Sequence, residues 1–197
     1  MPDNTYVRLR PLTKRDLDQM AGWEADEELN YLLGLHLERE QTAYWSHCEA
    51  LMNTPGNRLW AVETVEGKFI GEVELGQITW RTKEAELKIC IGDPRYHGQG
   101  YGTAAVEAVL DKAFYELKLE RVYLRVYNYN IRAVRCYLRN GFKKEAVLRN
   151  RRRFQGKNYD VYLMYIDSQT HESKERGKVR ASKLKNDSID KPLAGSL

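Results

Sequence analysis

The sequence predicts a mixed α/β domain in which helices flank a central, mostly antiparallel sheet. Three strand-like runs follow one another between residues 58 and 92, and the short connections between them are typical of an antiparallel meander. Two strand-and-helix segments and a final pair of strands come after this meander. The 197 residues, 42% of them hydrophobic, suffice for one such domain, which we place at residues 1–166, followed by a tail at 167–197.

The first residues alternate apolar and polar side chains in the run YVRLRPL, which predicts a half-buried strand that ends at its proline. Thr13 and Asp16 then have the spacing of a capping box, with Asp in place of Glu, and predict an amphipathic helix that extends to about Glu24. The leucines of residues 29–33 indicate a second, short helix. A third helix is expected over residues 42–53, where the turn cluster NTPGN stops it.

The rest of the domain is predicted from strand-like apolar runs and from glycine turns. Strands are expected over RLWAVET, KFIGEVELGQITW and EAELKICIG in the meander, and later over RVYLRVY, KKEAVLRNRRRF and NYDVYLMYI. One helix follows the meander and ends near Leu117, and another lies in NIRAVRCYLRNGF, where Asn140-Gly141 is a helix-end signal. The turn QGK joins the last two strands into a hairpin.

The tail at 167–197 is polar and rich in Ser, Lys and Asp, so we expect it to be disordered or loosely docked. A docked helix over residues 172–185 is the alternative, because Val179 and Leu184 offer a thin apolar face.

Composition excludes several classes of protein. The formal net charge of +4 is too small for a dedicated nucleic-acid binder. The apolar runs are far shorter than the roughly 18 residues that indicate a membrane span, and the first residues lack the pattern of a signal peptide. Cys48, Cys90 and Cys136 form no CxxC pair, which favours reduced, buried thiols and a cytoplasmic location. We expect no metal site.

Three closely spaced glycines, Gly98, Gly100 and Gly102, immediately precede a run of helix-forming residues. A glycine-rich turn at a helix N-terminus exposes backbone N–H groups to a phosphate or pyrophosphate. A Walker A loop is excluded because no Lys follows the glycines, and the dinucleotide fingerprint fits poorly because the third glycine comes one residue too early. A tight turn without a ligand remains the plain alternative.

The stretch HGQGYG resembles the CoA-binding turn of the GNAT N-acetyltransferase superfamily, [QR]-x-x-G-x-[GA], with His97 where Gln or Arg is usual. A second block, NYNIRAVRCYLRNGF, resembles the superfamily pattern N-x-x-A-x-x-x-Y-x-x-x-G-F in register. Asn130, Ala133 and Tyr137 of this block project from nearly one face of a helix, at about 100° per residue, and Asn130 is placed to cap it. The resemblance covers roughly residues 6–166.

This resemblance implies a sheet that splays open into a V, with acetyl-CoA as cosubstrate in the cleft. The cofactor-binding residues that it implies are Ile89, Cys90, Ile91, His97, Gly98, Gln99, Gly100, Tyr101, Gly102, Thr103, Asn130 and Ala133. Ile89, Cys90 and Ile91 would contribute main-chain hydrogen bonds to pantetheine, and nearby backbone N–H groups would stabilise the oxyanion.

The resemblance also implies direct attack of an amine on the thioester. In this mechanism Tyr137 protonates the departing thiolate, as the corresponding tyrosine does in many members. Glu86 is the candidate base that removes the amine proton through a water. Glu72 and Glu74 are the reserve candidates, either for the base or for recognition of the amine. A covalent route through Cys136 is disfavoured, because no histidine is evidently paired with it.

Within the superfamily the chain looks most like the branch of spermidine and ribosomal-protein alanine N-acetyltransferases, and the run GKNYDVYLMYI carries part of that likeness. The acidic residues 24–28 would suit a polycation, whereas the basic run at Arg149, Arg151, Arg152 and Arg153 would attract an acidic protein or RNA. A polyamine or other small amine and a protein N-terminus are therefore the candidate acceptors. A non-catalytic acyl-CoA-binding regulator and an RNA- or ribosome-associated protein are the alternatives, and we expect a homodimer that binds neither membrane nor nucleic acid.

Overall fold

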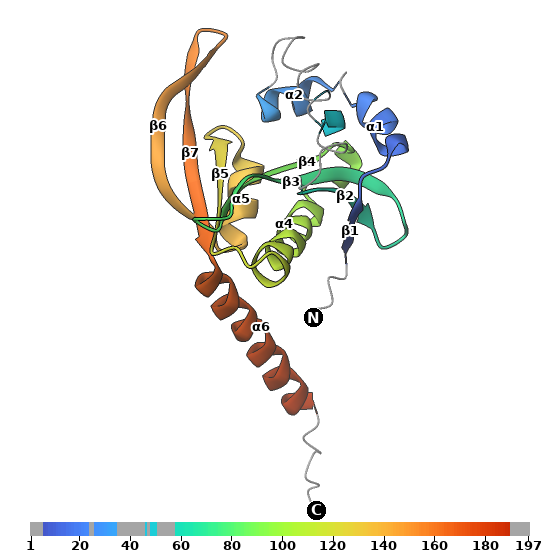
Figure 1. Ribbon diagram of the computed structural model, residues 1–197, viewed down its shortest axis with the longest axis vertical. Coiled ribbons are helices and arrows are strands. Elements are labelled where there is room, and N and C mark those ends of the chain that lie inside the picture. The colour runs from blue at the N-terminus through green and yellow to red at the C-terminus, as the bar shows by residue number, and fades with distance from the viewer. Residues whose placement is uncertain (1–5, 24–25, 35–45, 47, 51–57, 190–197) are drawn as a thin grey trace, which may run out of the picture.

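A seven-stranded mixed sheet with the strand order β1-β2-β3-β4-β5-β7-β6 forms the centre of the computed structural model, which describes residues 6–23, 26–34, 46, 48–50 and 58–189 (Figure 1). The strands are β1 (Val7–Pro11), β2 (Arg58–Thr64), β3 (Phe69–Thr79), β4 (Glu84–Ile91), β5 (Arg121–Tyr127), β6 (Lys143–Phe154) and β7 (Lys157–Asp167). Strands β4 and β5 are parallel, and the other neighbouring pairs are antiparallel. The predicted fold class and the antiparallel meander β2–β3–β4 are confirmed.

The helices are α1 (Lys14–Ala21), α2 (Glu27–Leu33), the short 3-10 turn η1 (Pro94–Tyr96), α4 (Tyr101–Asp111), the π-helical turn η2 (Lys112–Glu116), α5 (Ile131–Arg139) and α6 (Ser168–Ile189). The predicted capping box is present, since the Asp16 carboxylate accepts both the N–H and the hydroxyl of Thr13 at 2.7 Å. The helix expected over residues 42–53 falls mostly outside the described residues, although residues 46 and 48–50 are helical.

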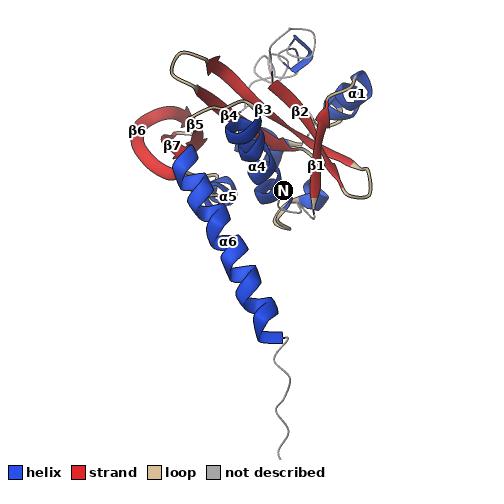
Figure 2. Ribbon diagram, turned by 60° about the horizontal axis from the view of Figure 1, so that its bottom comes forward, coloured by secondary structure: helices blue, strands red, loops and turns tan. Residues whose placement is uncertain are grey.

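The main core lies between one face of the sheet and the helices α4, η2 and α5, and Figure 2 shows α4 in front of the strands. Its fully buried side chains include Ile70, Leu75, Leu110, Leu124 and Met164. A smaller cluster lies on the opposite face beside α1 and contains Leu12, Met20, Cys48, Ala61 and Phe69. The two faces of the sheet are therefore covered by different helices.

The centre of the sheet opens between β4 and β5. These strands pair over three residues, from Glu84↔Arg121 to Glu86↔Tyr123, and then separate. Beyond Glu86, residues from both strands line a cavity instead of pairing with each other. The expected V-shaped opening is therefore present, and it creates a cleft between parallel strands.

The β6–β7 hairpin turns at Gln155 (φ +46°) and Gly156 (φ +75°). Two consecutive positive φ angles are typical of the tight turns that match the twist of antiparallel strands, so the QGK turn is confirmed. Gly141, with φ +94°, likewise follows the end of α5 as expected.

Residues 168–189 form the helix α6, where the sequence favoured a disordered or loosely docked tail (Figure 1). Its first turns are fixed to the domain by His171, which is fully buried against Phe114 and Tyr115 and lies 2.8 Å from Asp111 Oδ1. The compositional argument missed this anchor because one buried histidine leaves the average polarity of the segment unchanged. No helix of the described ranges is long and apolar enough to cross a membrane.

Candidate active site

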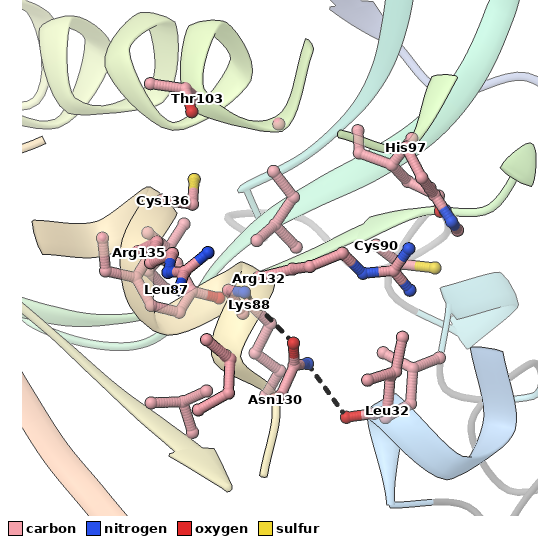
Figure 3. Close-up of a pocket in the computed structure, with 18 of the residues that line it drawn as sticks. Leu32, Leu87, Lys88, Cys90, His97, Thr103, Asn130, Arg132, Arg135 and Cys136 are labelled. Carbon is pink, nitrogen blue, oxygen red and sulfur yellow. Dashed lines mark hydrogen bonds between the residues drawn. The ribbon is translucent and has the colours of Figure 1, made fainter. Parts of the chain in front are cut away.

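A cavity of about 760 Å³ occupies the opening between β4 and β5 and extends toward α2, α5 and the N-terminus of α4 (Figure 3). Twelve of the residues implied by the sequence line it: Glu86, Ile89, Cys90, Ile91, His97, Gly98, Gly100, Gly102, Thr103, Asn130, Ala133 and Tyr137. The two motifs, which are about 30 residues apart in the chain, therefore meet at one cavity.

The glycine turn forms one end of this cavity. Gly98 and Gly100 have φ angles of +72° and +94°, and a Cβ atom added to either would meet no atom within 4 Å. Glycine is therefore favoured there by backbone conformation rather than by crowding. Gly100 is the N-cap residue of α4, whose first N–H groups and helix dipole favour an anion at this position.

The carboxylate of Asp93 fixes the segment that leads into the glycine turn. Its Oδ1 accepts the backbone N–H of Arg95 at 3.1 Å, and both of its oxygens accept guanidinium N–H groups of Arg95 at 2.9 and 2.7 Å. The Arg95 guanidinium lowers the pKa of the Asp93 carboxyl, which therefore stays ionised in the folded protein. Asp93 thus fixes the residues that immediately precede the glycine turn.

His97 closes the turn onto the end of β4, since its Nε2 lies 2.6 Å from the carbonyl oxygen of Ile91. A carbonyl oxygen can only accept, so Nε2 carries the hydrogen and donates it. The side chain that stands in place of the usual Gln or Arg therefore makes an internal bond from the turn to the strand.

The main chain of β4 presents alternate residues to the opening. The carbonyl of Cys90 points at Gly71 of β3, and the N–H of Gly92 also bonds to β3, at Ile70. Because these groups alternate along an antiparallel strand, the N–H and C=O of Ile89 and Ile91 point toward the opening. The main chain of Cys90 pairs with β3, which differs from the expectation that all three residues face the cleft.

Tyr137 of α5 is 7% exposed and lines the cavity. Burial raises the pKa of its phenol, with smaller contributions from Cys136 and Cys90. Its hydroxyl makes no hydrogen bond to the residues that the structure describes, and its ring packs on Phe142 at 5.7 Å. The site therefore contains a phenol that stays protonated and whose hydroxyl is available to a ligand.

Asn130 caps α5 as predicted, since its Oδ1 accepts the Ala133 N–H at 3.1 Å. Its Nδ2 also donates to the carbonyl of Leu32 at 3.3 Å, which joins the ends of α5 and α2 at the cavity (Figure 3). Both ends of the Asn130 amide are thus used within the protein.

The thiol of Cys136 lies between α5 and α4, beside Thr103 (Figure 3). Burial raises the pKa of this thiol, although hydrogen bonds with Thr103 and Asn140 oppose the shift. A thiol with a raised pKa is a poor nucleophile, which agrees with the view that Cys136 forms no acyl intermediate.

One face of the sheet, the face that bears α1 and α2, carries several charged side chains. Across β3 and β4, Glu72 pairs with Cys90 and Glu74 pairs with Lys88, so these side chains share that face. The side chains on this face are those of Glu72, Glu74, Glu86, Lys88 and Cys90. Glu86 is bound by Arg125 of β5 through two bonds, from Nε at 2.7 Å and from Nη2 at 3.0 Å. Glu74 is bound by Lys88 at 3.2 Å. We call this sheet face, at the opening, the acceptor face.

Four of the implied residues do not line the cavity: Gln99, Tyr101, Glu72 and Glu74. The Gln99 side chain is exposed and turns back to the Arg95 carbonyl, while Tyr101 packs on the rings of Tyr6 and Tyr96. Glu72 and Glu74 lie one strand farther from the opening, on β3.

Several residues that line the cavity were not foreseen: Leu29, Leu32, Leu33, Lys88, Arg125, Tyr127, Arg132, Arg135 and Arg139. The α5 arginines follow the helical spacing of the Asn130 motif, so that motif contained a signal for them. The leucines of α2 carried no such signal, because only tertiary packing brings α2 to the cavity.

The basic run on β6 is divided, because alternate residues of a strand point to opposite faces of the sheet. Arg152 donates to the Tyr127 hydroxyl at 3.1 Å, whereas Arg149, Arg151 and Arg153 are exposed. No group of three or more His, Cys, Asp or Glu that could hold a metal ion occurs in the described part of the chain.

Comparison with known protein families finds one matching family model and several relatives of similar sequence. The model of the acetyltransferase (GNAT) domain matches residues 7–143. The spermidine N(1)-acetyltransferase of Vibrio cholerae serotype O1 is 30% identical over 175 residues, which cover 83% of this chain and 94% of the relative. The Escherichia coli K12 enzyme of the same name is 31% identical over 163 residues, covering 75% of this chain and 78% of the relative.

Solved structures give the same grouping. A crystal structure of spermidine N-acetyltransferase from Vibrio cholerae, in complex with CoA and spermine, superposes with a TM-score of 0.72 at 26% identity, and covers 84% of this chain and 97% of that one. A dodecameric structure of spermidine N-acetyltransferase from Vibrio cholerae superposes with a TM-score of 0.68 at 27% identity, covering 84% of this chain and 95% of that one.

Proposed function

Because the chain belongs to the GNAT acetyltransferase family and is an N-acetyltransferase, we propose that it transfers the acetyl group of acetyl-CoA directly to a primary amine. The observation that carries this proposal is the single cavity between β4 and β5, which has the glycine turn at one end and the Tyr137 phenol in its wall. The acceptor that we propose is a polyamine or other small amine, or a protein N-terminus.

The residues present fit CoA. The backbone N–H groups of Gly98 to Thr103 would hold the pyrophosphate at the start of α4, where the helix dipole favours an anion. The open main chain of Ile89 would pair with pantetheine, and Ala133 leaves room beside it. Asn130 would act through its bonds to α5 and α2, which set the width of the cavity at that point.

Transfer requires a neutral amine, because an ammonium has no lone pair. The amine nitrogen attacks the thioester carbonyl carbon, a C–N bond forms, and the C–S bond then breaks. The departing thiolate takes the Tyr137 proton, and the extra proton on nitrogen leaves to water. The raised pKa of Tyr137 supports this role, since a phenol that stays protonated can serve as the acid.

Glu86 is the base that we propose for the amine proton, acting through a water. Each of its carboxylate oxygens accepts one bond from Arg125 and keeps a further lone pair for that water. Glu86 is almost fully buried, which favours action through a water over direct contact with the amine. Glu74 is paired with Lys88, and neither Glu72 nor Glu74 lines the cavity, which makes both weaker candidates for the base or for recognition of the amine.

Among acceptors, the names of the relatives support a polyamine of the spermidine class. A panel of spermidine, spermine, amino acids and N-terminal peptides, assayed for CoA thiol released from acetyl-CoA, tests the proposal. Thiol release and an acetylated amine in the mass spectrum are the expected result. If CoA binds but no amine in the panel releases thiol, the non-catalytic regulator is favoured instead.

RNA association through Arg149, Arg151 and Arg153 predicts an affinity that falls steeply with salt, and a filter-binding titration tests it. We also propose a cytoplasmic homodimer. Light scattering after gel filtration distinguishes a dimer from a larger assembly such as the dodecamer of the structural neighbour.

A further inference from the structure

Charge on the acceptor face is arranged in two layers. The carboxylates form the inner layer, since the side chains of Glu86 and Glu74 are 3% and 9% exposed. Their partners Arg125 and Lys88 form the outer layer, with side chains 54% and 40% exposed, and both line the cavity. An acceptor that enters from the opening therefore meets the cations before the carboxylates.

A second cavity, of about 460 Å³, adjoins the first one and is lined by residues of β5, β6 and β7. It shares Arg125, Val126 and Tyr127 with the first cavity and is completed by Leu148, Arg151 and Val161. Tyr127 pairs with Val161, and Val161 with Leu148, so these three side chains form one row across β5, β7 and β6. This row, Arg125 and Arg151 therefore line the same cavity.

Both arginines of this second cavity keep guanidinium N–H groups that make no hydrogen bond to the described residues. Arg125 binds Glu86 through Nε and Nη2, which leaves the two N–H groups of Nη1 for a ligand. Arg151 makes no ion pair with the described residues, and none of the described acidic side chains lines the second cavity. Glu86 holds the Arg125 guanidinium in place, so this donor is positioned before a ligand arrives.

We propose that the acceptor is a primary amine that also carries a carboxylate, and that Arg125 and Arg151 are the residues that select it. The carboxylate binds between the two guanidinium groups over the apolar row, while the amine lies toward the thioester end of the first cavity. A polyamine would instead bring further positive charge against Arg125, Arg151 and Lys88. The inference rests on the proposed acetyl transfer, and it separates carboxylate-bearing amines from polyamines among the acceptors left open above.

Matched acceptors that differ by one carboxylate test this selection. Lysine is compared with cadaverine, and phenylalanine with phenethylamine, by kcat/KM from CoA release, with spermidine alongside. The wild-type protein is expected to prefer the carboxylate-bearing member of each pair. The carboxylate also changes the basicity of the amine, so the decisive quantity is the change in this ratio between the wild type and a variant.

Arg151→Gln is the cleanest variant, because it removes a cation without breaking an ion pair. Its ratio for each pair is expected to fall roughly tenfold through a higher KM for the carboxylate-bearing amine, since a charge-assisted bond is lost. KM for phenethylamine should stay unchanged, and KM for the diamine cadaverine should fall because one repelling cation is gone. Arg125→Gln with Glu86→Gln removes both charges of this ion pair and should lower the ratio without leaving a buried, unpaired carboxylate. Arg153→Gln, an exposed arginine of the same strand outside both cavities, is the control and should leave the ratio unchanged.

Two outcomes overturn the inference while leaving acetyl transfer intact. One is a wild-type preference for spermidine and cadaverine over lysine. The other is an Arg151→Gln variant that changes both members of each pair equally. Failure of every amine to release CoA would overturn the proposed function itself, and with it this inference.

Discussion

The imidazole of His97 and the carbonyl of Ile91 are joined at 2.6 Å, which ties the glycine turn to the last residue of β4. The two ends of the CoA site that we propose, the anion-binding turn and the open edge of β4, are thus fixed relative to each other by one side chain.

His97→Ala removes the donor that holds the turn on β4. We expect the Kd for acetyl-CoA to rise about fivefold, because one hydrogen bond contributes about 1 kcal/mol. Titration calorimetry measures this change. His97→Gln restores a donor and should recover most of the affinity, whereas equal affinities for the wild type and the Ala variant would show that the link has no part in binding.

Tyr137→Phe removes the proposed acid while keeping the ring that packs on Phe142. We expect kcat to fall by about 10²–10⁴-fold, with little change in KM for acetyl-CoA, because the phenol acts on the leaving thiolate. Steady-state kinetics with both substrates varied provide the measurement. A change in KM alone would contradict the role.

The raised pKa of Tyr137 also predicts the pH profile of the wild type. Burial keeps the phenol protonated above its usual pKa near 10, while deprotonation of the acceptor ammonium favours attack as pH rises. The acceptor kcat/KM should therefore increase with pH through this range. A descending limb that begins below pH 10 and disappears in Tyr137→Phe would contradict this assignment.

Gly100→Ala and Gly102→Ala should have effects of opposite sign on stability. Gly100 has φ +94°, so Ala there is expected to lower the free energy of unfolding by about 1–2 kcal/mol. Gly102 is helical, and a Cβ atom there would lie 3.7 Å from Ile91 Cγ1, which is an ordinary contact. Ala at this position should therefore raise the free energy of unfolding by about 0.5–1 kcal/mol. Urea unfolding of both variants tests the pair, and a loss of stability in both would contradict the distinction.

Glu86→Gln tests whether this carboxylate acts as a base. A base role predicts a fall in kcat of about 100-fold or more, with a change in the ascending limb of the pH profile. If Glu86 acts solely by positioning Arg125, KM for the acceptor should rise instead. The double variant Glu86→Gln with Arg125→Gln separates the two, because it removes the need to position Arg125 but does not restore a base.

His171→Ala should detach the start of α6 without affecting catalysis. The side chain is fully buried against Phe114 and Tyr115 and bonded to Asp111, so its loss is expected to cost about 1–3 kcal/mol of stability. Thermal unfolding and kcat/KM are measured together. A double-mutant cycle with Asp111→Asn then isolates the pair, and full additivity would show that the contact contributes nothing.

Local sequence patterns were sufficient to predict the turns, caps and strands that build the site. The positive φ angles of Gly98 and Gly100, the Asn130 cap on α5 and the Thr13–Asp16 capping box each depend on a few neighbouring residues. The resemblance to the GNAT superfamily implied that Glu86 and Ile89 lie beside the opening. These features could be anticipated because backbone conformation and side-chain direction follow from short-range sterics and hydrogen bonding.

Other features depended on contacts between distant parts of the chain. The α2 leucines reach the cavity, His171 anchors α6 beside η2, and the Cys90 main chain pairs with β3, yet no local pattern specifies any of these partners.

The sequence by itself determined the family, the order of elements and the two motifs that meet at the cavity. Tertiary structure alone decided that Arg125 covers Glu86 and, with Arg151, borders a second cavity. The physical reason is that the sign of the charge presented to an acceptor depends on which member of an ion pair is buried. Burial is set by the packing of β4, β5 and the β6–β7 hairpin rather than by the composition of any one of them.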